Sequence, residues 1–271
     1  MVSLAAGIIG CGVMGTALGR RLIASGEIIP ANLWLFDMDR QKLNDIASEL
    51  GAEPAANLEQ LFQQCRNIFV AVKPQDVKSA AGGWAELFQP AVHLLISLAA
   101  GVTIGFYEEH LPAGSKVIRL MPNTPSLIGE GAVAMSTGKA VTSQEAAEIG
   151  KLLGCLGLVV PVDEQNMDVV TGLSGSGPAY VYLFIETLID AGVNLGLSRE
   201  TAAALAVQTV LGAARMVRES GRHPVELRND VTSPAGTTAA ALEALETGRF
   251  RGALLRAVKA AAQRSGELSD D

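Results

Sequence analysis

Residues 6–15 read AGIIGCGVMG, an apolar run that passes directly into three glycines, Gly10, Gly12 and Gly15. This G-x-G-x-x-G spacing between a strand and a helix is typical of a dinucleotide-binding turn. The first glycine permits a tight turn, the second admits a pyrophosphate, and the third lets helix and strand pack closely. A strand-to-helix turn without a ligand is the alternative. We expect cofactor contacts from Gly10, Cys11, Gly12, Val13, Met14 and Gly15.

An acid follows the second apolar run at the distance that this motif requires. Asp37 comes directly after LWLF and lies 22 residues after Gly15, close to the roughly 20 residues expected of the acid that binds a ribose hydroxyl. A carboxylate there would repel a 2′-phosphate, so the cofactor NAD(P)H is predicted with a slight preference for NADH. Arg40 is either a solvated residue in the first turn of a helix or a side chain that turns inward and admits NADPH.

The first part of the chain alternates between short apolar runs and amphipathic segments. The runs LAAGII, LWLF, NIFVAV, HLLISL and KVIRL are separated by expected helices at 14–25, 39–50 and 75–88. This alternation predicts an α/β fold with a parallel, doubly wound Rossmann sheet. VAMS and LVVPV, with a helix at 143–155 between them, complete the sheet. We expect residues 1–162 to form the dinucleotide-binding domain.

From about residue 163 the strand-like runs stop, and long helices are expected at 178–197, at 199–220 and from 248 onward. Residues 179–189 are apolar on nearly every side, and a helix of this kind must be buried on most sides. About 110 residues can hardly cover several such helices within one chain. We therefore expect residues 163–271 to form an all-α domain that binds substrate and forms a homodimer.

Composition excludes several partners. The chain of 271 residues has a net charge of −7 and no Lys/Arg cluster, which argues against nucleic acid. Its apolar runs are broken before the roughly 18 residues of a membrane span. Three isolated cysteines and three scattered histidines predict neither a disulfide framework nor a metal site. The N-terminus lacks the basic segment of a signal peptide, so a cytoplasmic protein with a small-molecule partner is expected.

Five further stretches carry polar or turn residues where strands or helices end. AVKPQ at 71–75 places Lys73 at a strand end, where a cofactor or plain solvent could meet it, and SLAAGV and MPNTP follow later strands. GLSGSGPAY at 172–180 brings its backbone close to a ligand or to a neighbouring helix. DVTSPAGTT at 230–238 holds no usual acid or base after Asp230. Taken alone it predicts a helix start with Thr232 or Ser233 as cap and Pro234 in the first turn.

In combination, GIIGCGVMG, AVKPQ, SLAAGV, RLMPNTP, GLSGSGPAY and DVTSPAGTT, in this order across nearly the whole chain, resemble the pyrroline-5-carboxylate reductase family. The resemblance implies NADH- or NADPH-dependent reduction of 1-pyrroline-5-carboxylate to L-proline, the last step of proline biosynthesis. It also implies a Rossmann domain and a helical domain that interleaves into a dimer. In many members the dimers assemble further into rings.

The resemblance also assigns roles to individual residues. Thr238 matches a catalytic threonine whose hydroxyl lies near the ring nitrogen. Matches to substrate-binding positions are Glu164, Ser176, Asn229, Asp230, Ser233, Gly236 and Thr237. Matches to cofactor-binding positions are Asn57, Ala71, Val72, Lys73, Pro74 and Ala99. The chain departs from some members in having DMDR at 37–40, so the family's cofactor preference does not transfer. It also has the order Asn229-Asp230 where some members have Asp-Asn, which departs from the family pattern at that pocket contact.

The implied chemistry needs no titrating side chain in the DVTSPAGTT stretch. Hydride transfer to a C=N bond depends on positioning, and a protonated cyclic imine is already electrophilic. A β-hydroxyacid dehydrogenase, the nearest alternative enzyme, would need a proton-transferring lysine on the first long helix, and Pro178 to Leu195 contains none. A non-catalytic dinucleotide sensor would not need the second polar site formed by GLSGSGPAY and DVTSPAGTT.

Overall fold

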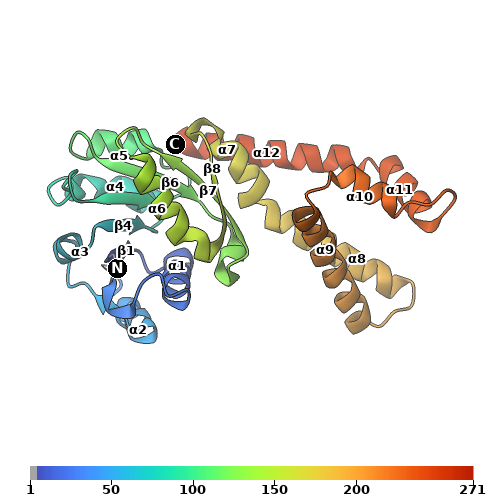
Figure 1. The fold of residues 1–271 in the computed structure, drawn as a ribbon, viewed down its shortest axis with the longest axis horizontal. Coiled ribbons are helices and arrows are strands. Elements are labelled where there is room, and N and C mark those ends of the chain that lie inside the picture. The colour runs from blue at the N-terminus through green and yellow to red at the C-terminus, as the bar shows by residue number, and fades with distance from the viewer. Residues whose placement is uncertain (1–4, 271) are drawn as a thin grey trace. The chain divides into compact units, whose positions relative to one another are not determined.

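The chain forms two compact units in a computed structural model that describes residues 5–270. The sheet unit runs to Gly175 and includes the chain from Ala261 onward, and the helical unit is Ser176–Ala260 (Figure 1). This division differs from the predicted boundary after residue 162, because the intervening segment is bonded to the sheet unit. The Asn123 amide donates to the carbonyl of Ser174 over 3.0 Å.

The sheet unit is built on eight strands in the order β3-β2-β1-β4-β5-β6-β7-β8. The strands are parallel except that β7 runs antiparallel to β6. Strands β1 to β3 extend the sheet to one side of β1, and β4 begins its extension to the other side. This change of side between β1 and β4 is the switch point that the predicted Rossmann topology requires. The strands are β1 Ala6–Ile9, β2 Leu33–Phe36, β3 Glu53–Pro54, β4 Asn67–Val70, β5 Leu94–Ser97, β6 Lys116–Met121, β7 Gly131–Thr137 and β8 Gly157–Pro161.

Helices cover both faces of this sheet because successive strand residues point to opposite sides. Ile8 belongs to the core cluster that also contains residues of three helices, and Ile9 belongs to the cluster on the other face (Figure 1). The first face carries α1 Val13–Ala24, α2 Arg40–Leu50 and α6 Ser143–Leu153; the second carries α3 Leu58–Gln64, α4 Pro74–Trp84 and α5 Ile104–His110. The doubly wound prediction is confirmed.

Several ends and short elements differ from the sequence prediction. Helix α4 ends at Trp84 instead of residue 88, and α6 ends at Leu153, where a 3₁₀ turn over Gly154–Leu156 takes over. Strand β3 and helices α3 and α5 were not predicted. They span only 2, 7 and 7 residues, which is too short for a hydrophobic period to emerge.

After β8 the chain passes through an irregular helical segment before it leaves the sheet unit. A 3₁₀ turn at Glu164–Asn166 leads into α7 (Met167–Val170) and then into a π-helical turn over Thr171–Gly175. Such wide turns are rare and occur frequently at functional sites. This one contains the first four residues of the GLSGSG stretch.

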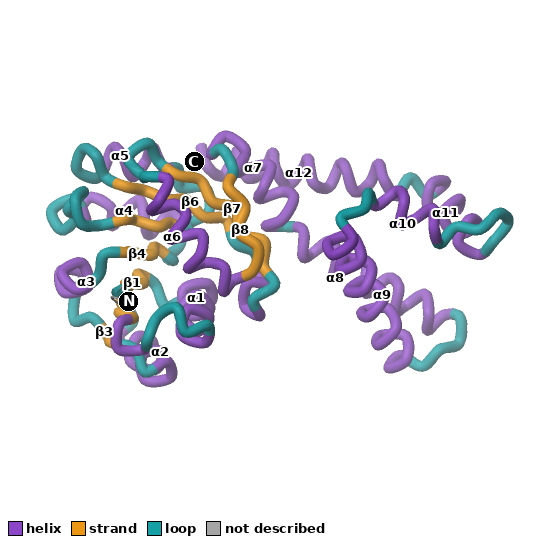
Figure 2. Tube along the Cα trace, viewed as in Figure 1, coloured by secondary structure: helices purple, strands orange, loops and turns teal. Residues whose placement is uncertain are grey.

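The helical unit has almost no core of its own. Within Ser176–Ala260 only Ala202 and Ala206 are buried, although α8 is strongly apolar. All strands described belong to the other unit (Figure 2). Among the helices of residues 5–270, none has both the length and the apolar character needed to cross a membrane. The helices are α8 Gly177–Asn194, α9 Arg199–Ser220, α10 Pro224–Asp230, α11 Thr237–Thr247 and α12 Phe250–Asp270, whose last turns belong to the sheet unit.

Glu145 fastens the start of α6 to the sheet. It forms a capping box with Thr142, and its Oε1 accepts hydrogen bonds from Lys116 Nζ at 2.7 Å and Arg66 Nη2 at 3.1 Å. Burial opposes ionisation of Glu145, but the hydrogen bonds from Lys116 and Thr142 outweigh it and lower the pKa from 4.5 to about 2. The ionised carboxylate therefore stabilises the fold.

We predict that Glu145→Gln lowers the free energy of unfolding near neutral pH by roughly 2–3 kcal/mol. Because the folded pKa lies below the unfolded value, this contribution is fully present above about pH 5 and is lost as the pH falls toward about 2. Urea unfolding at several pH values would measure it. Glu148→Gln, on the exposed side of α6, is the matched control. A difference from wild type that stays constant between neutral pH and about pH 3 would contradict the prediction.

Candidate active site

The glycine turn after β1 leaves room for a ligand at one glycine and none at the other two. Gly10 has a φ of +103°, and a Cβ there would lie 2.7 Å from Val72 Cγ1. A Cβ on Gly15 would lie 2.0 Å from the carbonyl oxygen of Gly10, whereas a Cβ on Gly12 would meet nothing within 4 Å. The backbone therefore shows the tight turn at Gly10 and the close packing at Gly15, and it leaves space beside Gly12.

The start of α1 is suited to hold a phosphate. Helix α1 begins at Val13 without a side-chain cap, and the N–H of Thr16 is the first to bond within the helix, to the carbonyl of Gly12 at 2.9 Å. The preceding N–H groups point out of the helix end, where the dipole is positive. With the open space beside Gly12, this arrangement fits the pyrophosphate of a dinucleotide.

The other predicted cofactor residues follow neighbouring parallel strands. Asp37 follows β2, residues 71–74 follow β4, and Ala99 follows β5. The carboxyl ends of these strands meet at one edge of the sheet, which is where ligands bind in open α/β folds. Lys73 is exposed and precedes Pro74, the first residue of α4. The structure thus brings the predicted cofactor residues of three strands to the edge that carries the glycine turn.

Asn57 has a local structural task. Its side-chain oxygen accepts a hydrogen bond from the N–H of Gln60 at 2.8 Å and so caps α3. Its predicted contact with the adenosine ribose remains a proposal.

Asp37 is held in place by several donors. Its Oδ2 accepts hydrogen bonds from the N–H of Cys11 at 2.8 Å and from Lys42 Nζ at 3.0 Å, and its Oδ1 accepts one from the N–H of Asp39 at 2.9 Å. Partial burial opposes ionisation of Asp37, but these donors together hold its pKa below the ordinary value. Lys42 was not anticipated, because a lysine in the first turn of an amphipathic helix carries no signal of its own.

The contacts of Arg40 bear on whether its side chain is solvated or turned toward the ribose, which the sequence left open. It lies exposed in the first turn of α2, and its guanidinium donates to the carbonyl oxygens of Ala55 at 3.1 Å and Ala56 at 2.5 Å. Its Cζ also lies 5.6 Å from the centre of the Phe36 ring. In this structure Arg40 is therefore bonded to backbone carbonyls and is not turned toward the predicted ribose position.

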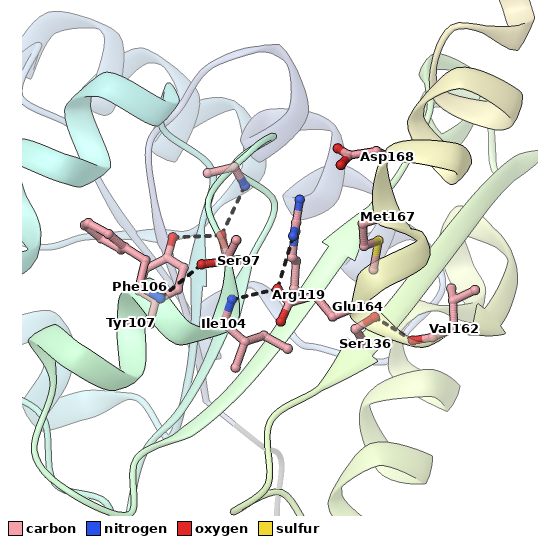
Figure 3. Close-up of polar contacts among 12 residues, drawn as sticks. Ser97, Ile104, Phe106, Tyr107, Arg119, Ser136, Val162, Glu164, Met167 and Asp168 are labelled. Carbon is pink, nitrogen blue, oxygen red and sulfur yellow. Dashed lines mark hydrogen bonds and ion pairs between the residues drawn. The ribbon is translucent and has the colours of Figure 1, made fainter. Parts of the chain in front are cut away.

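Two polar contacts are buried at the carboxyl end of strand β5. The Ser97 hydroxyl bonds to the Tyr107 hydroxyl at 2.8 Å and accepts from the N–H of Ala99 at 3.2 Å (Figure 3). Burial raises the pKa of Tyr107, which keeps the phenol neutral. Arg119, paired with Ser97 in the strand register, points toward Glu164 in Figure 3. The Ser97 and Tyr107 pair supports the loop that contains Ala99.

Glu164 links three elements of the sheet unit. Its Oε1 accepts hydrogen bonds from the N–H of Ile104 at 2.7 Å and from Arg119 Nη1 at 3.1 Å. The Arg119 side chain is only 8% exposed, so the carboxylate balances a buried charge. The pair borders a cavity of about 410 Å³. The sequence placed Arg119 in the RLMPNTP motif but assigned it no role, since its partner lies far away in the chain.

In the helical unit, the loop before α11 leads into a helix start that has no side-chain cap. Helix α11 begins at Thr237 with Gly236 as its N-cap residue and no side-chain cap. Capping by Thr232 or Ser233 with Pro234 in the first turn is therefore wrong: the Thr232 hydroxyl bonds instead to the carbonyl of Arg228 at 2.7 Å. The first N–H groups of α11 have no intrahelical acceptor, and such groups attract anions.

The remaining predicted substrate residues also belong to the helical unit, whereas Glu164 belongs to the sheet unit. Asn229 and Asp230 end α10, and Asp230 Oδ2 pairs with Arg222 Nη1 at 2.7 Å. This hydrogen bond lowers the pKa of Asp230. Ser176 is the half-buried N-cap residue of α8.

The chain matches known proteins over nearly its full length. Residues 164–268 match the family model described as pyrroline-5-carboxylate reductase dimerisation, and residues 5–101 match the model described as NADP oxidoreductase, coenzyme F420-dependent. A pyrroline-5-carboxylate reductase of Arabidopsis thaliana is 42% identical over 98% of this chain and 96% of its own length.

Solved structures agree with these matches. That of a pyrroline-5-carboxylate reductase from Coxiella burnetii superposes with a TM-score of 0.92 at 35% identity, covering 98% of each chain. That of the Plasmodium falciparum pyrroline carboxylate reductase with NADP bound superposes with a TM-score of 0.87 at 34% identity, covering 99% of each chain.

The Rossmann sheet carries a glycine turn without a side-chain cap and is followed by a helical region that matches a dimerisation model. These features place the protein among the NAD(P)-dependent oxidoreductases. The full-length relatives narrow this class further. The chain belongs to the pyrroline-5-carboxylate reductase family.

We predict that two alanine substitutions in the glycine turn affect different properties, one cofactor binding and the other stability. Gly12→Ala should keep the free energy of unfolding within about 1 kcal/mol of wild type, because its Cβ meets open space. It should weaken cofactor binding at least about tenfold, because that space is the predicted place for the pyrophosphate.

Gly15→Ala is the matched comparison and should lower the free energy of unfolding by about 2 kcal/mol or more, because its Cβ would strike backbone. Urea unfolding and fluorescence titration with NADPH and NADH measure the two effects. Full cofactor affinity in Gly12→Ala would contradict the assignment of this turn.

Proposed function

We propose that this protein reduces 1-pyrroline-5-carboxylate to L-proline, the last step of proline biosynthesis, by hydride transfer from NADH or NADPH to the C=N bond. Relatives named pyrroline-5-carboxylate reductase match it over nearly its whole length. The observation that carries the proposal within the molecule is the uncapped start of α1 beside the open face of Gly12.

The sheet unit would hold and orient the cofactor. Residues 10–15 would hold the pyrophosphate, Asp37 and Asn57 the adenosine ribose, and residues 71–74 with Ala99 the nicotinamide half. When bound, the nicotinamide supplies the hydride, and the protein supplies position and electrostatics. The buried Ser97 and Tyr107 pair would keep the Ala99 loop from shifting.

The helical unit would bind the substrate. We assign the carboxylate to the loop of Ser233, Gly236 and Thr237, because the first N–H groups of α11 are free to receive an anion. The Thr238 hydroxyl would bond to the ring nitrogen. Further pocket positions are Glu164, Ser176, Asn229 and Asp230.

The proton balance suits a site without an acid at its centre. Residues 231–238 contain no titrating side chain, and an imine protonated in solution accepts hydride at carbon to give the amine directly. Positioning is therefore the main demand on the protein. The β-hydroxyacid dehydrogenase alternative is weakened further, because α8 is a helix over Gly177–Asn194 and has no lysine.

We also propose a homodimer through the helical region. The side chains of α8 and α9 would lose exposed apolar area on association, and Leu183, for example, is 63% exposed. The family model that matches residues 164–268 is a dimerisation model. A ring of dimers, a cytoplasmic location and a domain boundary after residue 162 remain proposals, the last supported by the start of that model at residue 164.

We predict that the purified protein oxidises NADH or NADPH when 1-pyrroline-5-carboxylate is added, followed by the loss of nicotinamide absorbance. A chelator should not slow the reaction, because a protonated imine needs no Lewis acid. Turnover of a 3-hydroxyacid without any reduction of the imine would contradict the proposal.

Thr238→Ala should lower kcat/KM for the imine by about 10- to 100-fold, the effect of losing one hydrogen bond to a charged group. The free energy of unfolding should stay within about 1 kcal/mol of wild type, and Thr238→Ser should restore most of the activity. Thr247→Ala, exposed at the other end of α11, is the control. Unchanged kinetics in Thr238→Ala would remove this residue from the mechanism.

Sedimentation velocity at micromolar concentration should show a dimer or a multiple of dimers. Leu183→Glu on α8 should shift the distribution toward monomer, because burying an unpaired charge in an interface is costly. Val92→Glu, an exposed apolar position in the sheet unit, should leave it unchanged. A stable wild-type monomer would contradict the proposed interface.

A further inference from the structure

We propose that Lys42 recognises the 2′-phosphate of NADPH, so that one ribose site accepts both NADPH and NADH. The inference rests on the proposed cofactor site and adds its specificity. It replaces the simple expectation that the carboxylate of Asp37 excludes a phosphate.

Asp37 is not an isolated negative charge. Lys42 Nζ lies 3.0 Å from its Oδ2, and the N–H groups of Cys11 and Asp39 bond to the same carboxylate. A carboxylate compensated in this way repels a phosphate far less than a free one. The nearby charges of Asp37 and Asp39 are matched by those of Lys42 and Arg40.

Of the two nearby cations, Arg40 is committed elsewhere. Its guanidinium bonds to the carbonyl oxygens of Ala55 and Ala56 and lies over the Phe36 ring. These contacts tie the start of α2 to the loop before α3. Releasing Arg40 toward a phosphate would leave those contacts unmade.

Lys42 is free to exchange partners. Its side chain is 41% exposed and its ammonium offers three donors on a flexible stem. With NADH, the ribose hydroxyl would donate to Asp37 while Lys42 stays paired to it. With NADPH, Lys42 would turn its donors to the phosphate. Because Asp37 is the proposed ribose contact, both partners would lie within reach of the same ammonium.

Isothermal titration calorimetry with two fragments isolates the 2′-phosphate. Adenosine 2′,5′-bisphosphate carries this group, and adenosine 5′-monophosphate lacks it. Lys42→Ala should weaken binding of the bisphosphate at least about tenfold, the value of one charge-assisted hydrogen bond. Binding of the monophosphate should change less than about threefold. Lys42→Arg should keep most of the preference, and Lys151→Ala, which removes an exposed lysine of α6, should leave both affinities unchanged.

Steady-state kinetics provides the second readout. The ratio of kcat/KM for NADPH to that for NADH should fall at least about tenfold in Lys42→Ala, and Arg40→Gln should affect both cofactors alike. An unchanged ratio and unchanged fragment binding in Lys42→Ala would overturn the inference. Selective loss of the bisphosphate in Arg40→Gln alone would also overturn it. If wild type binds the fragments but reduces no imine, the proposed function fails while the binding data still decide the role of Lys42.

Discussion

The constraint on which the proposed cofactor site depends is the close contact between the backbone of Gly15 and the carbonyl of Gly10. No side chain fits between them, since even a Cβ on Gly15 would lie 2.0 Å from the Gly10 oxygen. This approach fixes the start of α1 against the end of β1. The free N–H groups of that helix therefore face the edge where β2, β4 and β5 also end. The proposed cofactor residues after those strands are useful only because this contact sets where the phosphates would lie.

Around that edge, buried charge and hydroxyl groups hold the loops rather than perform chemistry. Arg119 is buried and balanced by Glu164, which also receives the N–H that opens α5. Ser97 bonds to Tyr107 and to the loop of Ala99. Such networks are costly when half satisfied and stiff when complete. A reaction that depends on positioning benefits from this stiffness, because small displacements of the reacting atoms slow hydride transfer.

The helical unit, in contrast to the sheet unit, has almost no buried core. It buries only two alanines within Ser176–Ala260, so its apolar helices need another surface to be stable. It also carries the loop before α11, where Ala235 has a φ of +56°. A non-glycine residue in this left-handed region is strained, and such strain persists where surrounding structure holds it. The proposed substrate loop is thus built into the same region that is expected to form the dimer.

The sequence by itself determined the Rossmann fold, the helical second part and the family. Glycine spacing and apolar period are local properties, and the order of six motifs identifies relatives. Short elements such as β3 and α5 could not be predicted from the sequence, because they hold too few residues to show a hydrophobic period. The partners of Arg40, Lys42 and Arg119 could not be predicted either. Arg119 meets Glu164 across 45 residues, and Arg40 meets carbonyls 15 and 16 residues away. Which side chain a charge contacts depends on where strands place it in space, and only the tertiary structure decided that.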